Sequence, residues 1–179
     1  MMIDVVCLAD NGGASVAARL AVDHLDIGRA NLAGQDIFEI CDSDSGGWES
    51  VFAAVFAPGG QGEWFGDLEF DEPVNHLLFL HKAVFHPCLR TWRKFTLDHV
   101  ASLCGEDSAI VMWRGESGLT DKELAELGFR NIAGSAMLVR PNMLQHSYNA
   151  NQDPRDVLDL NVPPDANQYV ELHWETGRR

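Results

Sequence analysis

Several features that would place a chain in a special class are scarce or missing here. No run approaches the ~20 apolar residues that a membrane span needs, and the start lacks the basic segment of a secretory signal, so we expect no membrane association. The cysteines lie far apart and form no C-x-x-C, which predicts reduced thiols in a cytoplasmic protein, with neither a zinc cluster nor a disulfide framework. They are Cys7, Cys41, Cys88 and Cys104.

Basic side chains are also few. Lys and Arg number 13 against 27 Asp and Glu, which gives a formal net charge of −14. Residues 1–80 hold 14 acids and two arginines, a net charge of −12. Direct nucleic-acid binding needs a broad cationic face, so this charge disfavours it. The acidity is typical of a well-solvated surface, and it equally suits a protein that mimics a polyanion and occupies a basic partner.

One segment runs against the acidic trend. Residues 73–97 contain no Asp or Glu. Their basic side chains are Lys82, Arg90, Arg93 and Lys94, with three histidines among them. A locally cationic segment in an acidic chain indicates an anion site, the alternative being a strand and helix that are merely short of acids.

The 179 residues are 46% hydrophobic and 22% charged, which suits one globular domain of ordinary composition. In the first half the residue patterns predict a strand over 3–8, a helix over 14–26, a loop over 29–35, a β-hairpin over 36–57 and a loop over 58–73. A helix over 48–57 is the competing interpretation of that segment.

The second half carries clearer signals. The patterns predict a central strand over 76–85, a helix over 91–104, a strand over 108–113, a helix over 121–127 and a strand pair over 129–132 and 136–140. Thr120 and Glu123 fit a capping box at the start of the helix over 121–127. The order of elements predicts an α/β fold.

The end of the chain differs in composition. Residues 141–168 are rich in Asn, Asp, Gln and Pro, so we expect one domain over 1–145 and an irregular C-terminal extension over 146–179. Residues 169–174 alternate between polar and apolar, which predicts an edge strand that would pair with a second subunit in a homodimer.

The segment 76–142 resembles the second half of the GNAT family of N-acetyltransferases. The resemblance is carried by HKAVFHPCLR at 81–90, by the helix over 93–103, by the strand over 108–113 and by ELAELGFR at 123–130. It covers about a third of the chain. It implies a mixed, mostly antiparallel sheet flanked by helices, in which acyl-CoA lies in an opening between the fourth and fifth strands. Shortened versions of this pattern occur in phage-encoded members.

The resemblance places the acyl-CoA at the end of the long strand and the start of the next helix, where backbone N–H groups attract a pyrophosphate. The residues at these positions are Val84, Phe85, Arg90, Thr91, Arg93 and Lys94. The family's loop carries glycines that are absent here, and Trp92 stands in their place. Either the arginines bind the phosphates by charge, or the site no longer binds CoA.

Acyl transfer to an amine needs a base for the amine proton. His81 and His86 are the candidates, since imidazole titrates near neutral pH. They lie five residues apart, so their side chains point to opposite faces unless a bulge intervenes. Glu69 and Asp71 are alternatives. Cys88, beside Arg90 and His86, is a further candidate as a thiol of lowered pKa; no residues lie at metal-ligand spacing.

Two functions remain open. The resemblance implies an acyl-CoA-dependent N-acyltransferase, using acetyl-CoA or another acyl-CoA, that acts on an amine of a small molecule or a protein. The alternative is a catalytically inactive GNAT-fold acidic protein that binds a basic macromolecular partner, as a polyanion mimic or inhibitor.

Overall fold

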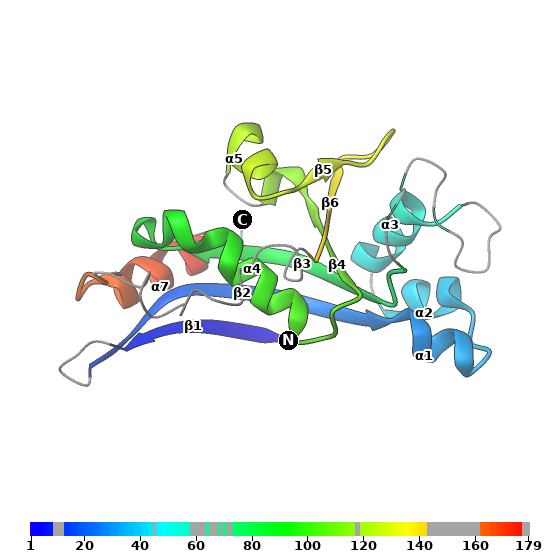
Figure 1. Ribbon diagram of the computed structural model, residues 1–179, viewed down its shortest axis with the longest axis horizontal. Helices are drawn as coiled ribbons and strands as arrows, with labels where there is room; N and C mark the ends of the chain where they lie inside the picture. Colours follow the sequence, from blue (N-terminus) through cyan, green and yellow to red (C-terminus); the bar gives the residue numbers. More distant parts are fainter. Residues whose placement is uncertain are drawn as a thin grey trace, which may run out of the picture.

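The protein folds around a single sheet (Figure 1). The computed structural model describes residues 1–8, 13–44, 46–57, 64, 68, 70, 73–116, 119–142 and 162–176. These residues form a six-stranded sheet in the order β1-β2-β3-β4-β6-β5. The strands are β1 (Met2–Leu8), β2 (Ala14–Asp26), β3 (His76–Phe85), β4 (Ser108–Trp113), β5 (Arg130–Asn131) and β6 (Met137–Pro141). Within the described residues β3 and β4 pair in parallel and the other neighbours are antiparallel.

Helices cover both faces of this sheet. They are α1 (Ile27–Leu32), α2 (Ile37–Asp44), α3 (Gly46–Val55), α4 (Arg93–Ser102), α5 (Asp121–Glu126) and α7 (Ala166–Thr176), with short 3₁₀ turns η1 (Pro87–Trp92) and η2 (Arg114–Glu116). This arrangement confirms the predicted fold class of an α/β protein with a mostly antiparallel sheet flanked by helices. No helix in the described ranges is long and apolar enough to cross a membrane.

The alternation of side chains along each strand divides the core in two. Leu77 and Phe79 of β3 point to one face and pack with Trp48 of α3. Leu78 and Leu80 point to the other face, where α4 and α5 lie. Because β3 is buried on both faces over this stretch, it occupies the centre of the sheet, as its apolar sequence predicted.

The helix predicted over 14–26 is wrong, because these residues form the long strand β2. Leu20 and Val22 enter the core beside Leu78 and Leu80, and Leu25 enters the opposite core. A spacing of four between apolar residues fits both a helix and every second position of a strand. Pairing with β1 on one side and β3 on the other therefore overrides the helix propensity of the alanines.

The β-hairpin predicted over 36–57 is also wrong, since α2 and α3 occupy that segment, and the alternative helix over 48–57 is confirmed. Trp48, Val51 and Val55 are buried at helical spacing, which explains the outcome. The loop predicted over 29–35 is partly helical, because Asp26 caps α1 by accepting a hydrogen bond from the Arg29 N–H.

The C-terminal helix α7 replaces the edge strand predicted over 169–174. Val170 and Trp174, four residues apart, lie on the buried face of this helix. The helix packs on β2 and β3, where Lys82 donates a hydrogen bond to the Trp174 carbonyl and lies over its indole ring. The strand pairing that prompted the homodimer prediction is therefore absent from this segment, and the homodimer stays a prediction.

A buried ion pair ties α4 to strand β6 on the same face of the sheet. The Arg140 guanidinium of β6 is fully buried and donates hydrogen bonds to Asp98 of α4 and to the carbonyl of Leu127, which follows α5. Its Nη1 has no hydrogen-bond partner among the described residues. This pair fixes α4 and α5 relative to β6 at the cost of burying two charges.

Candidate functional site

The central strands separate at one end of the sheet. The pairing of β3 with β4 runs from His76↔Ser108 to Leu80↔Met112 and ends there, while β3 continues to Phe85 paired with β2 alone. Figure 1 shows β4 and β6 rising away from the layer of β1, β2 and β3. Among the described residues, the last five of β3 are therefore unpaired on the β4 side, which is where the resemblance implies an opening.

A β-bulge lies at the mouth of this opening. Ala21 of β2 pairs with Lys82 and the next residue, Val22, pairs with Leu80, so His81 is the extra residue of β3. A bulge interrupts the alternation of side chains and redirects the extra one. The opposite orientation that strict alternation assigns to His81 and His86 thus no longer follows from their spacing.

His81 forms a dyad with Asp23 of β2. Its Nε2 lies 2.5 Å from Asp23 Oδ2, and its ring lies 4.1 Å from that of Phe79. An ionised carboxylate only accepts hydrogen bonds, so Nε2 carries the hydrogen and Nδ1 is the nitrogen left to take a proton. The side chains of His81 and Asp23 are 36% and 39% exposed, so both are within reach of a substrate.

A cavity of about 360 Å³ lies beside Asp23, between β2 and the helices α2 and α3. Its lining residues are Asp23, His24, Leu25, Ile40, Cys41, Ser43, Asp44 and Trp48. Burial, followed by the nearby Asp44 carboxylate, raises the pKa of the Cys41 thiol to about 11. We refer to this space as the acidic cavity, since two carboxylates and neither Lys nor Arg line it.

His86 has a structural position. It is the N-cap of η1, where Nδ1 accepts a hydrogen bond of 3.2 Å from the Cys88 N–H. Its side chain is buried, and its ring meets the edge of Tyr169 from α7 at 4.8 Å between centroids. His86 therefore has its acceptor nitrogen engaged, whereas Nδ1 of His81 has no hydrogen-bond partner among the described residues.

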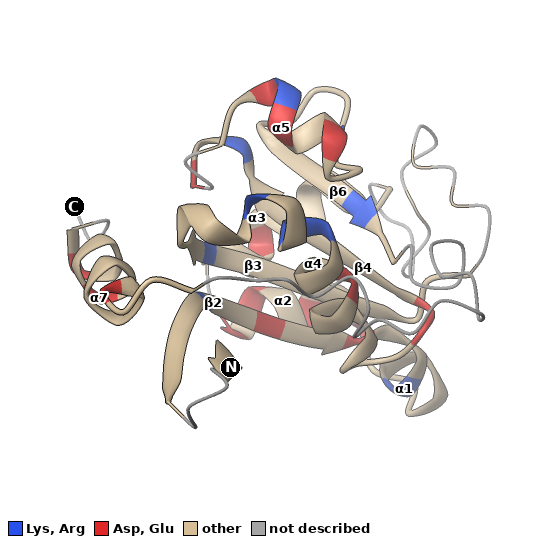
Figure 2. Ribbon diagram, turned by 60° about the vertical axis from the view of Figure 1, so that its left-hand side comes forward, with Lys and Arg blue, Asp and Glu red and all other residues tan. Residues whose placement is uncertain are grey.

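A second cavity, also of about 360 Å³, lies between η1, the start of α4, and α5. Its lining residues are Pro87, Arg90, Arg93, Thr120, Lys122, Glu123 and Glu126. Figure 2 shows basic residues at the start of α4 and acidic residues along β2. We call this space the basic cavity for its three cationic side chains, although two carboxylates also line it.

The cations of the basic cavity are only partly neutralised. Arg93 Nη1 donates to Glu123 Oε1 at 3.2 Å, and its guanidinium lies over the ring of Phe85 at 5.8 Å. Arg93 Nε has no hydrogen-bond partner among the described residues. Hydrogen bonds from Thr120, and then the Arg93 charge, lower the pKa of Glu123. Arg93 therefore keeps one donor that is unpaired within the described ranges and is buried beside the cavity.

The other residues predicted to bind the cofactor lie around this cavity. Thr91 is exposed on η1, Lys94 is half-buried in the first turn of α4, and Val84 pairs with Arg19 of β2. None of the three lines the basic cavity. Two of the six predicted residues, Arg90 and Arg93, are therefore brought together there, with Phe85 beneath Arg93.

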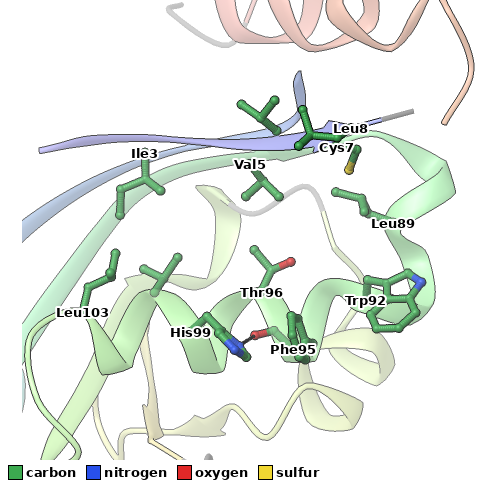
Figure 3. Close-up of a pocket in the computed structure, with 12 residues that line it drawn as sticks. Ile3, Val5, Cys7, Leu8, Leu89, Trp92, Phe95, Thr96, His99 and Leu103 are labelled. Atoms are coloured by element: carbon green, nitrogen blue, oxygen red, sulfur yellow. Dashed lines mark hydrogen bonds between the residues drawn. The ribbon is translucent and has the colours of Figure 1, made fainter. Parts of the chain in front are cut away.

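The Trp92 indole does not fill the basic cavity. It lines a separate apolar groove of about 560 Å³ between β1 and α4, shown in Figure 3. Ile3, Val5 and Cys7 form the β1 wall of this groove. Trp92, which replaces a glycine of the family's loop, therefore lies outside the basic cavity.

The prediction of a reactive Cys88 is wrong in its direction. Burial, and then the neighbouring Cys7 thiol, raise the pKa of Cys88. A raised pKa keeps the sulfur protonated and poorly nucleophilic at neutral pH. The alternative bases Glu69 and Asp71 lie outside the described residues. In the part of the chain that is described, no three metal-ligating side chains gather into a site.

Sequence reasoning missed Asp23, Asp44 and the acidic cavity. The patterns predict a helix over 14–26 and a hairpin over 36–57. Those two elements would not bring Asp23 and Asp44 to one cavity. Leu20 and Val22 are buried two residues apart, as in a strand. This period of two was the signal that could have placed Asp23 beside the long strand.

A scan against protein-family models, a search of curated proteins and a search of solved structures each found no match to this chain. The GNAT resemblance accordingly depends on the residues named above.

Proposed function

We propose that the protein is an acyl-CoA-dependent N-acyltransferase that acts on an amine. The observation that carries the proposal is the end of β3–β4 pairing at Leu80↔Met112, immediately before the bulged His81. A thioester in that opening would lie next to a base. The two cavities lie on opposite faces of the sheet, one cationic and one acidic.

In this proposal the CoA diphosphate binds in the basic cavity. Arg90, Arg93 and Lys122 supply the positive charge there. Charge replaces the close backbone approach that glycines permit in the family. His81, oriented by Asp23, takes the amine proton at Nδ1. The four cysteines, all unpaired, support a cytoplasmic location.

Acetyl-CoA binding tests the donor half of the proposal. We expect acetyl-CoA to raise the melting temperature by mass action, and Arg90→Ala with Lys122→Ala to weaken binding at least tenfold. Arg29→Ala, which removes a positive charge on α1 outside the cavity, is the control for each single replacement. Absence of any shift at millimolar acetyl-CoA contradicts the proposal.

The second candidate is a GNAT-like scaffold without catalysis that binds a basic partner. It is favoured by Glu123 and Glu126 in the basic cavity, which oppose a phosphate ligand, and by the net charge of −12 over residues 1–80. The test is a pull-down in low and high salt. Recovery of a basic protein that is lost in high salt, together with no acetyl-CoA binding, would favour the scaffold.

A further inference from the structure

We propose that the end of β2 and the start of β3 bind a divalent late transition-metal cation such as Zn²⁺, with His24 and His76 as the two protein ligands. His24 Nε2 lies 3.1 Å from His76 Nδ1, so two imidazole nitrogens from neighbouring strands face each other. Imidazole is a preferred ligand of zinc, copper and nickel ions. The inference does not depend on the proposed acyl transfer.

The two nitrogens have the spacing of ligands that share one metal ion. A zinc–nitrogen bond measures about 2.0–2.1 Å, so two nitrogens on one zinc at a near-tetrahedral angle lie roughly 3.3 Å apart. The observed 3.1 Å also fits a hydrogen bond in which one ring donates its N–H to the other. A metal ion would take the place of that shared hydrogen, and the donating ring would then carry its hydrogen on the other nitrogen.

A carboxylate lies behind the His76 ring. His76 Nε2 is 3.7 Å from Asp107 Oδ1, which exceeds a hydrogen bond by about 0.5 Å. Asp107 Oδ2 accepts a hydrogen bond of 2.6 Å from the side chain of Asn75, which holds the carboxylate in place. A histidine that binds a metal through one nitrogen usually directs its other N–H to a carboxylate, which fixes the tautomer and makes the ring a stronger ligand. Asp107 is placed to do this for His76, and it leaves Nδ1 for the metal.

The turn before β4 is built closely around the same ring. Gly105 has a φ of +141°, and a Cβ at this position would lie 2.7 Å from His76 Cδ2 and 2.7 Å from Asp107 Oδ1. Only a glycine allows the backbone to pass this close. The His76 ring therefore has little room to turn, and its Nδ1 is held in the direction of His24 before any ion binds.

Charge and exposure at this position also suit a cation. The Asp26 carboxylate lies 3.9 Å from His76 Nδ1 and adds negative charge. Its Oδ1 accepts the Arg29 N–H that caps α1, so we count two protein ligands and assign the remaining coordination positions to water. His24 is exposed, which gives an ion a path from solvent. Mg²⁺ prefers oxygen ligands, so this pair of nitrogens should discriminate against it.

The test is calorimetric titration of the full chain with ZnCl₂ at neutral pH, after removal of metal with EDTA and dialysis. We expect one bound Zn²⁺ per chain. Because the carboxylate partner of a ligand alone is worth ~10–100-fold in metal affinity, both His24→Ala and Asp107→Asn should weaken Zn²⁺ binding at least about tenfold. His173→Ala is the matched control, since it removes an exposed histidine from α7 and should bind Zn²⁺ as the parent chain does.

Cu²⁺ identifies the ligand atoms without any substitution. The electron paramagnetic resonance spectrum of the parent chain with one equivalent of Cu²⁺ should show coupling to two nitrogens, and this readout stands even where a variant fails to fold. In a folded His24→Ala chain one of these nitrogen couplings should be lost.

Four outcomes would overturn the inference: no Zn²⁺ binding at millimolar concentration, equal losses in His24→Ala and His173→Ala, displacement of Zn²⁺ by an equal concentration of Mg²⁺, or a Cu²⁺ spectrum without coupling to two nitrogens. Zn²⁺ affinity that is unchanged in Asp107→Asn would contradict binding at Nδ1 of His76. None of these results bears on acetyl-CoA binding, so the two proposals are tested separately.

Discussion

The basic and the acidic cavities have similar volumes but differ in how their walls are built. The acidic cavity lies against α2 and α3, which pack on the sheet through apolar side chains such as Cys41 and Trp48. The basic cavity lies against α4 and α5, which are fixed by the buried Asp98–Arg140 pair as well as by apolar packing. The sheet therefore separates two opposite charges on two differently anchored pairs of helices. In the proposed function, each face receives the substrate of complementary charge, and the two substrates meet where β3 leaves β4.

The largest effect is expected at the buried Asp98–Arg140 pair, which holds α4 beside the basic cavity. Asp98→Ala leaves the Arg140 guanidinium buried without its charged partner, so we expect a loss of about 3–5 kcal/mol in unfolding free energy. Urea denaturation measures it. Replacing both residues, as in Asp98→Leu with Arg140→Met, should recover most of the loss. A loss below about 1 kcal/mol for Asp98→Ala would contradict the account of this anchor.

The next effect concerns the dyad between the two cavities. We expect His81→Gln to lower kcat/KM for acetyl transfer to an amine at least about 100-fold, since general-base catalysis contributes ~10²–10⁴-fold. His86→Gln, which removes a capping histidine and leaves the dyad, should affect the urea midpoint more than the pH profile of kcat/KM. The acidic limb of that profile should disappear in His81→Gln alone. A limb that persists would assign the base elsewhere.

A smaller effect is expected at the edge of the basic cavity. Thr120→Ala removes the N-cap of α5, at a cost of about 1 kcal/mol in unfolding free energy. Because the pKa of Glu123 is lowered in the folded state, its contribution is present above the unfolded pKa and is lost as the pH falls through the folded pKa. Thr120→Ala should therefore also reduce the acid dependence of the urea midpoint. Thr91→Ala, at an exposed residue of η1, is the control.

The smallest effect should appear on the acidic side. Burial, and then the charge of His76, lower the pKa of His24, whose Nε2 lies 3.1 Å from His76 Nδ1. A histidine with a lowered folded pKa binds protons more readily when unfolded. Stability is then retained above the unfolded pKa, near 6.5, and falls as the pH drops toward the folded value. Urea midpoints between pH 7.5 and 5.5 should fall less in His24→Gln than in the parent chain, and equal slopes would exclude this pair as the cause.

The second half of the chain could be predicted because its sequence signals are short-range and each fits only one kind of element. The continuous apolar run at 76–85 has few alternatives to a central strand, and Thr120 with Glu123 forms the capping box that their spacing predicted. In the first half the strand over 3–8 is confirmed, but the segment Ala14–Asp26 could not be predicted, because its apolar spacing fits both a helix and a strand and the outcome depends on pairing with β1 and β3. The candidate site divides in the same way. His81 and Arg90 became candidates through the resemblance, whose residues are contiguous in sequence, whereas Asp23 required the register of β2 against β3.

The packing of α7 on β2 also has a consequence for biosynthesis. Arg19 joins Asp4 of β1 to Glu171 of α7, a contact that spans 152 residues. A ribosome adds roughly 5–20 residues per second, so Arg19 is synthesised about 8–30 s before Glu171. During that interval the surface of β2 that α7 later covers is exposed. A nascent chain that stalls before α7 would present this surface to chaperones.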